Sequence, residues 1–300
     1  MEKIKLFADK GSYANKSQWA KIIDYALLGI GVAFLLAGTI FFFAYNWANM
    51  HRFTKLGIIE TLIILGTGSV FALRSKSTIQ NILLTTVSIL VGLLFSVFGQ
   101  IYQTGADAYD FFLGWSIFIT LWAIISKFPP LWIIFYTLVN ITIILYSQQV
   151  AENWSVTFTC ILLFIVGIST ILVLNLCQQF FGTVVPDWVL KIFALTTAFF
   201  ITVGLIVGLN RPGLEWFIGL SFCLITYCCA VFFAIKSRLL YLLCIVALST
   251  IGICSALLLK TLSMEETSSF LFVSLFIIFS ITLLTSKLIT LQNDWSRNEE

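Results

Sequence analysis

Residues 81–107 read NILLTTVSILVGLLFSVFGQIYQTGAD, an apolar run followed by a short polar turn. Small or polar residues recur here at every third or fourth position: Asn81, Thr85, Ser88, Gly92, Ser96, Gly99 and Gln103. On an α-helix this spacing places them on one face, and Leu, Val, Ile and Phe cover the rest. Inside a membrane bundle, such a face brings neighbouring helices close together. The stretch therefore predicts a transmembrane helix packed within a helical bundle.

The whole composition points the same way. Of the 300 residues, 60% are hydrophobic and only 10% are charged. A soluble domain with this balance would have too few polar residues to cover its surface. A transmembrane helix needs about 20 apolar residues, and the chain offers runs of that length many times over. The runs are continuous, whereas β-barrel strands alternate. The fold class is therefore predicted to be all-α, a polytopic transmembrane helical bundle.

The apolar runs predict ten membrane spans within one domain. We expect the spans at 22–45, 55–73, 80–101, 108–126, 130–147, 154–176, 187–208, 213–235, 238–259 and 267–287. Residues 1–21 form a short cytoplasmic lead-in and residues 289–300 a cytoplasmic tail. The bundle, 22–288, comprises a motif-bearing half at 22–130 and an apolar packing half at 131–288. The two shortest spans flank a Pro pair at 129–130, which would also fit a re-entrant turn.

The distribution of Lys and Arg predicts the orientation. With the N-terminus inside, twelve Lys and Arg residues flank spans on the cytoplasmic side and four on the other side. The positive-inside rule therefore places both termini in the cytoplasm and residues 100–107 outside. The formal charge of +3 is explained by this topology. We accordingly expect a lipid bilayer as the environment and no nucleic acid as a partner.

Polar residues of the first half gather at the predicted outer face and form the candidate binding face. The residues are Tyr45, Asn46, Trp47, Arg52, Glu60, Gln100, Tyr102, Gln103 and Asp107. Glu60 lies about five residues, or roughly 8 Å, inside its predicted span. A carboxylate there is a functional candidate, but a surface pair with Arg52 or Lys55 would also explain it. Asp107 fits a helix cap better than a catalytic acid.

The amides of Gln100 and Gln103 would be wasted on lipid, so they are expected to bond neighbouring spans or a solute. Tyr45, Trp47 and Tyr102 are more typical of the aromatic belt at a membrane surface. Packing is predicted from small residues. Ser88, Gly92 and Ser96 should face the first or second span, and Gly204 and Gly208 form a GxxxG pair in the second half.

Four motifs of the first half resemble a known family. They are AYNW at 44–47, RFTKL at 52–56, GQIYQTGAD at 99–107 and FLGW at 112–115. Together they are similar to the bacterial predicted-membrane-protein family of unknown function number twenty-one fifty-seven, over about residues 20–130. The resemblance implies a multi-pass protein of the bacterial inner membrane. It groups the polar motif residues without giving them roles, and it names no cofactor.

Three classes of function fit the sequence. We favour a transport-type protein for a small or amphiphilic solute, with the polar face of the third span lining a path. The alternative is a non-catalytic subunit or scaffold of a cell-envelope membrane complex, bound to an envelope protein partner. An enzyme ranks last, because no nucleophile–base pair, metal motif or phosphate loop is found. The chain has one histidine, His51, and no metal or cofactor is expected.

Overall fold

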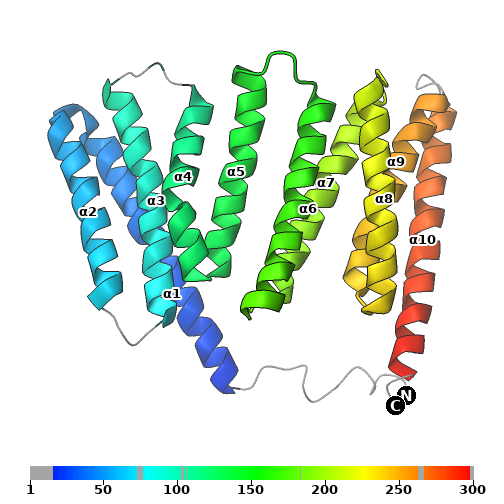
Figure 1. Cartoon of the computed structure of the whole chain (residues 1–300), viewed down its shortest axis with the longest axis horizontal. Helices are drawn as coiled ribbons and strands as arrows, with labels where there is room; N and C mark the ends of the chain where they lie inside the picture. The colour runs from blue at the N-terminus through cyan, green and yellow to red at the C-terminus, as the bar shows by residue number, and fades with distance from the viewer. Residues whose placement is uncertain are drawn as a thin grey trace. The chain divides into compact units, whose positions relative to one another are not determined.

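The computed structural model describes residues 16–72, 77–102, 105, 107–182, 184–262 and 267–297. Over these residues the chain forms ten α-helices and one short 3-10 helix, with no strand (Figure 1). Each of the ten helices is long and apolar enough to cross a membrane. This confirms the predicted all-α fold class with about ten spans.

The chain divides into two compact units, Met1–Leu138 and Val139–Glu300. The helices of the first unit are α1 (Lys16–Asn46), η2 (Trp47–Asn49), α2 (Arg52–Ala72), α3 (Ser77–Tyr102), α4 (Ala108–Ser126) and the start of α5 (Pro129–Gln149). The second unit holds the end of α5, α6 (Val156–Phe181), α7 (Asp187–Gly208), α8 (Leu214–Lys236), α9 (Leu240–Thr261) and α10 (Thr267–Arg297).

The two predicted spans beside the Pro pair are complete helices. α4 has 19 residues and α5 has 21, which is enough for each to cross a bilayer alone. Lys127 ends α4 in a left-handed conformation with φ 48°. Pro129 and Pro130 then take the first positions of α5, where a helix needs no intrahelical N–H donor. The Pro pair therefore starts a helix.

α3 is the most buried helix of the first unit. In its apolar span 44% of the residues are buried, against 6% in α1, 11% in α2 and 17% in α4. One side of α3 packs on α2, where a Cβ at Gly66 would come within 2.5 Å of Val87. Another side packs on α4. The burial predicted for this span is confirmed.

The second unit is held together by glycines that let helices approach closely. A Cβ at Gly204 of α7 would lie 2.6 Å from the Cβ of Cys160 in α6. A Cβ at Gly208 would lie 2.6 Å from Trp216 and 2.8 Å from the hydroxyl of Thr157. No larger residue fits either place, so the predicted role of this GxxxG pair in packing is confirmed.

Candidate functional site

The motifs of the first half meet at one end of the first unit. α1 and α3 end there and α2 and α4 begin there, at the top in Figure 1. Gly105, between α3 and α4, has φ +63°, a left-handed conformation in which glycine avoids the steric strain of a side chain. This explains the glycine near the end of GQIYQTGAD. The alternation of helices thus brings the three motifs AYNW, RFTKL and GQIYQTGAD to one end.

Three of the candidate residues at this end make local side-chain contacts. The Asn46 side chain donates to the carbonyl of Phe42 at 2.9 Å. The guanidinium of Arg52 lies 5.2 Å from the centre of the Phe53 ring, and the Tyr102 ring lies 4.6 Å from that of Phe98. These contacts stay within one segment of chain.

The remaining candidates at this end are exposed or fall outside the description. Tyr45 is 88% exposed, and Gln100 is also exposed. The side chain of Trp47 and the whole of Gln103 lie outside the described residues. Asp107 stands at the N-cap position of α4, as predicted, although its side chain makes no capping hydrogen bond. The carbonyl of Asp107 accepts from the N–H of Asp110 at 3.1 Å.

Glu60 occupies a different place from the other candidates. It is the ninth residue of α2, so it lies about 12 Å along the helix from Arg52 at 1.5 Å per residue. Its side chain is exposed on α2. Lys55 and Ile59 are buried, at 7% and 0% exposure. Ile59 belongs to the cluster that α2 forms with α3, so Glu60 faces away from this packed side.

The polar face of α3 contacts α4. The indole N–H of Trp115 donates to the carbonyl of Ser88 at 2.7 Å. A Cβ at Gly92 would lie 2.6 Å from the same ring. The expectation that Gly92 faces the first or second span was wrong, because Gly92 leaves the room that the large Trp115 ring of α4 fills. For the side chains of Ser88 and Ser96 the same expectation stays a prediction. The first span has small residues at a matching spacing, Ala26, Gly29, Ala33 and Ala37; in α1 the first three are exposed and Ala37 is half-buried.

Comparison with known proteins agrees with the motifs. Residues 2–132 match the family described as "Predicted membrane protein (DUF2157)". No curated protein and no solved structure matches the chain. The DUF2157 match covers α1 to α4 and ends in the first turn of α5. The resemblance inferred from the motifs is therefore confirmed, and it covers the part of the chain that holds every candidate residue.

Outside the DUF2157 match, the structure reveals a row of three hydrogen-bonded side-chain hydroxyls that the sequence did not predict. We call this row the hydroxyl chain. The hydroxyl of Thr202 donates to the carbonyl of Ala198 at 2.6 Å. Ser249 lies 2.5 Å from Thr202, and the phenol of Tyr227 lies 2.5 Å from Ser249. Each hydroxyl has one proton, so the donors run in order from Tyr227 through Ser249 to Thr202. The hydroxyl chain links the three helices α8, α9 and α7.

Every donor in this hydroxyl chain has an acceptor, so the chain ties helices together and presents no reactive group. Tyr227 and Ser249 are both buried. The only sign of the hydroxyl chain in the sequence was that its polar residues lie in the middle of apolar spans. Among the residues that the structure describes, no three His, Cys, Asp or Glu side chains come together as a metal site.

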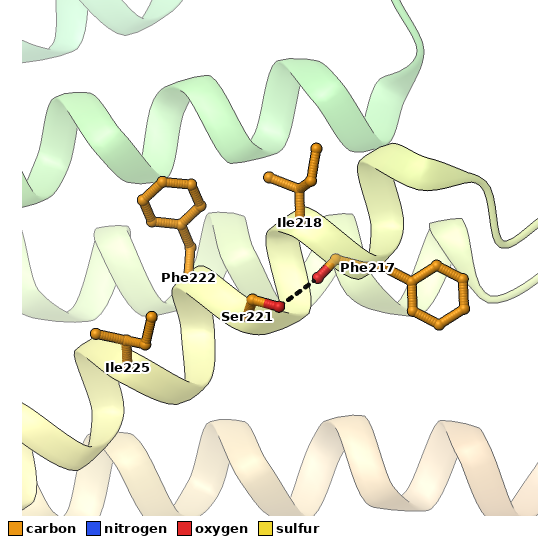
Figure 2. Close-up of a pocket in the computed structure, with 5 residues that line it drawn as sticks. All are labelled: Phe217, Ile218, Ser221, Phe222 and Ile225. Atoms are coloured by element: carbon orange, nitrogen blue, oxygen red, sulfur yellow. Dashed lines mark hydrogen bonds between the residues drawn. The ribbon is translucent and has the colours of Figure 1, made fainter.

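A shallow hollow lies on the surface of α8. Figure 2 shows its lining side chains, Phe217, Ile218, Ser221, Phe222 and Ile225, all from one helix. The hydroxyl of Ser221 donates to the carbonyl of Phe217 at 2.9 Å, so it is already satisfied within the helix. The hollow offers apolar contact and no charged group, which suits lipid chains and gives no basis for selecting a polar ligand.

Proposed function

We propose that the protein is a non-catalytic subunit or scaffold of a membrane complex, and that α2 holds its partner. The observation that carries the proposal is Glu60, a carboxylate exposed on a transmembrane helix about 12 Å from the helix start. Insertion experiments give a free-energy cost of about 2.5–3.5 kcal/mol for a charged side chain at the centre of a helix in the bilayer. A neighbouring polypeptide that contacts Glu60 would remove much of that cost.

The transport reading has less support. It needs a path along the polar face of α3, but Trp115 fills the space beside Ser88 and Gly92 and bonds to the backbone there. Ion-coupled carriers also place several ionisable groups and broken helices near the middle of the membrane. α3 runs unbroken from Ser77 to Tyr102. These observations favour a packed wall over a solute path.

The setting of the proposed complex is the inner membrane of a bacterium, with both termini in the cytoplasm. The excess of Lys and Arg on one side supports the orientation, and the DUF2157 match supports a membrane protein. In this orientation the motif-bearing end of the first unit lies outside the cytoplasm. Glu60 then lies in the outer half of the bilayer.

In-cell photo-crosslinking tests the proposal. A photoreactive amino acid would replace Ile64, which is 69% exposed one turn after Glu60. The control position is Ile124 in α4, which is 67% exposed. We expect a discrete protein adduct from position 64 and only lipid from position 124. The adduct should fall about tenfold in Glu60→Gln, equivalent to about 1.4 kcal/mol, at equal membrane abundance.

Two results would contradict the scaffold proposal. Lipid adducts alone at both positions would overturn the scaffold proposal. A solute flux in vesicles containing only the purified protein, lost in Glu60→Gln, would establish transport in its place. Glu60→Gln suits both assays because the amide keeps the shape of the side chain, so membrane abundance should stay unchanged.

A further inference from the structure

We infer that the partner of α2 is a transmembrane helix that presents a lysine or arginine to Glu60. This inference rests on the scaffold function proposed above and names the chemistry of the partner. The surface concerned is the acid face of α2, defined by Phe53, Glu60, Ile64 and Phe71. These four side chains are exposed, and at 3.6 residues per turn they lie along one line of the helix.

The opposite side of α2 is already occupied. Lys55 and Ile59 are buried, and a Cβ at Gly66 would collide with Val87 of α3. By contrast, a Cβ at Gly57 or Gly68 would have nothing within 4 Å. Both glycines lie beside the acid face, so another helix can approach the backbone of α2 closely there. The shape of the acid face therefore suits a helix.

The charge of the acid face is not balanced from α2 itself. The neighbours of Glu60 one turn away are Leu56, Gly57, Ile63 and Ile64, all uncharged. The guanidinium of Arg52 lies over the Phe53 ring at the start of the helix, and Lys55 is buried on the other side. A carboxylate in an apolar span needs a cation or a donor from its surroundings.

A second copy of the chain fits this face poorly. Two α2 helices packed in parallel through their acid faces would place Glu60 against Glu60, and like charges in a low dielectric repel. A lysine or arginine on a different helix gives the opposite sign and a charge-assisted hydrogen bond. The acid face therefore selects a different polypeptide, with one basic residue at the depth of Glu60.

Synthetic transmembrane peptides test this chemistry directly. Leu-rich peptides of 21 residues, the length of α2, would carry Lys, Leu or Glu at the ninth position. Energy transfer would report their association with the labelled full-length protein in phosphatidylcholine vesicles. We expect the Lys peptide to bind about tenfold more tightly than the Leu peptide, the size of one strong interhelical polar pair. The Glu peptide should bind least.

Glu60→Gln should bring the Lys and Leu peptides to the same affinity. Thr61→Val is the matched control, because the Thr61 hydroxyl already donates to the carbonyl of Gly57 at 2.6 Å; it should keep the preference for Lys. Equal binding of the Lys and Leu peptides to the unmodified protein would overturn the inference whatever the variants do. So would a Lys preference that survives in Glu60→Gln.

The two proposals fail separately. If position 64 gives a Glu60-dependent protein adduct in cells while the peptides bind alike, the scaffold function stands and the basic-helix partner is wrong. If the Lys peptide binds selectively but position 64 gives only lipid adducts, the acid face binds cations but serves no complex, and the scaffold proposal is wrong.

Discussion

The indole N–H of Trp115 in α4 donates to the carbonyl of Ser88 in α3 at 2.7 Å. The same ring fills the space beside Gly92, one turn further along α3. Two features of the sequence are explained together: a row of small residues in one span and the tryptophan of the FLGW motif in the next. The small-residue face of α3 around Ser88 and Gly92 is therefore a packing surface for α4.

Gly92→Ala should destabilise the protein. The added methyl would lie 2.6 Å from the Trp115 ring, and the ring cannot retreat without stretching its bond to Ser88. Overpacking of this kind costs about 1–3 kcal/mol. Thermal unfolding in detergent would measure the loss, with Gly38→Ala as the control, since a Cβ there meets nothing within 4 Å. Equal melting temperatures for the two variants would refute the close packing.

The direction of the hydroxyl chain predicts unequal effects. Tyr227→Phe removes the first donor and leaves Ser249 donating to Thr202, so it should cost about 0.6 kcal/mol, the average for interhelical bonds in membranes. Ser249→Ala removes the acceptor of the Tyr227 phenol and the donor to Thr202 together, so it should cost more, about 1–3 kcal/mol. The double variant should cost less than the sum.

Thermal unfolding of the three variants would measure these differences. Thr250→Ala is the control, because the hydroxyl of Thr250 bonds only its own helix, at the carbonyl of Val246, 2.8 Å away. If Tyr227→Phe lowers the melting temperature more than Ser249→Ala does, the hydroxyls do not donate in the inferred order.

Hydropathy was sufficient to locate the spans. The predicted 108–126 and 187–208 coincide with α4 and α7, because polar or proline-containing loops end the apolar runs sharply. The partner of Gly92 could not be predicted, since a small residue shows only that something large is near. Nothing in the sequence distinguished Trp115 from the other aromatic residues of the spans as the partner of Gly92. Likewise, Thr202, Tyr227 and Ser249 are far apart in sequence, and only the packing of three helices brings their hydroxyls together.

The candidate site was predictable in part. The alternation of spans was enough to place the AYNW and GQIYQTGAD motifs at one end of the first unit. The side of α2 on which Glu60 lies could not be predicted. By their spacing in the sequence, both Arg52 and Lys55 could have paired with Glu60. Lys55 is in fact buried because it lies one turn from Ile59 on the packed side of α2.

Lys260 should stabilise the second unit through α7. Its ammonium donates to the carbonyl of Leu209 at the end of α7, where the helix dipole favours a positive charge. Lys260→Met should therefore lower the free energy of unfolding by about 0.3–1 kcal/mol, and Lys260→Arg should restore most of it. Lys236→Met is the matched control, since Lys236 lies in the last turn of α8 as Lys260 lies in the last turn of α9. An equal loss in both methionine variants would exclude a special role for the Leu209 contact.

The proposed orientation can be measured by cysteine labelling. In a background without native cysteines, Asn49→Cys should react with a membrane-impermeant reagent applied to intact cells. Ser237→Cys should react only after the membrane is opened. Both positions are exposed, Asn49 at the end of η2 and Ser237 between α8 and α9, so the difference reports the side of the membrane. Labelling of Ser237→Cys alone in intact cells would reverse the orientation.

Native mass spectrometry of the protein purified from its own membranes in mild detergent tests directly whether Glu60 holds a partner polypeptide. The comparison is between the unmodified protein, Glu60→Gln and the control Thr61→Val. We expect the unmodified protein and Thr61→Val to carry the same additional polypeptide, and Glu60→Gln to have the mass of the chain without it. The same mass for all three proteins, with or without a bound polypeptide, would contradict the role assigned to Glu60.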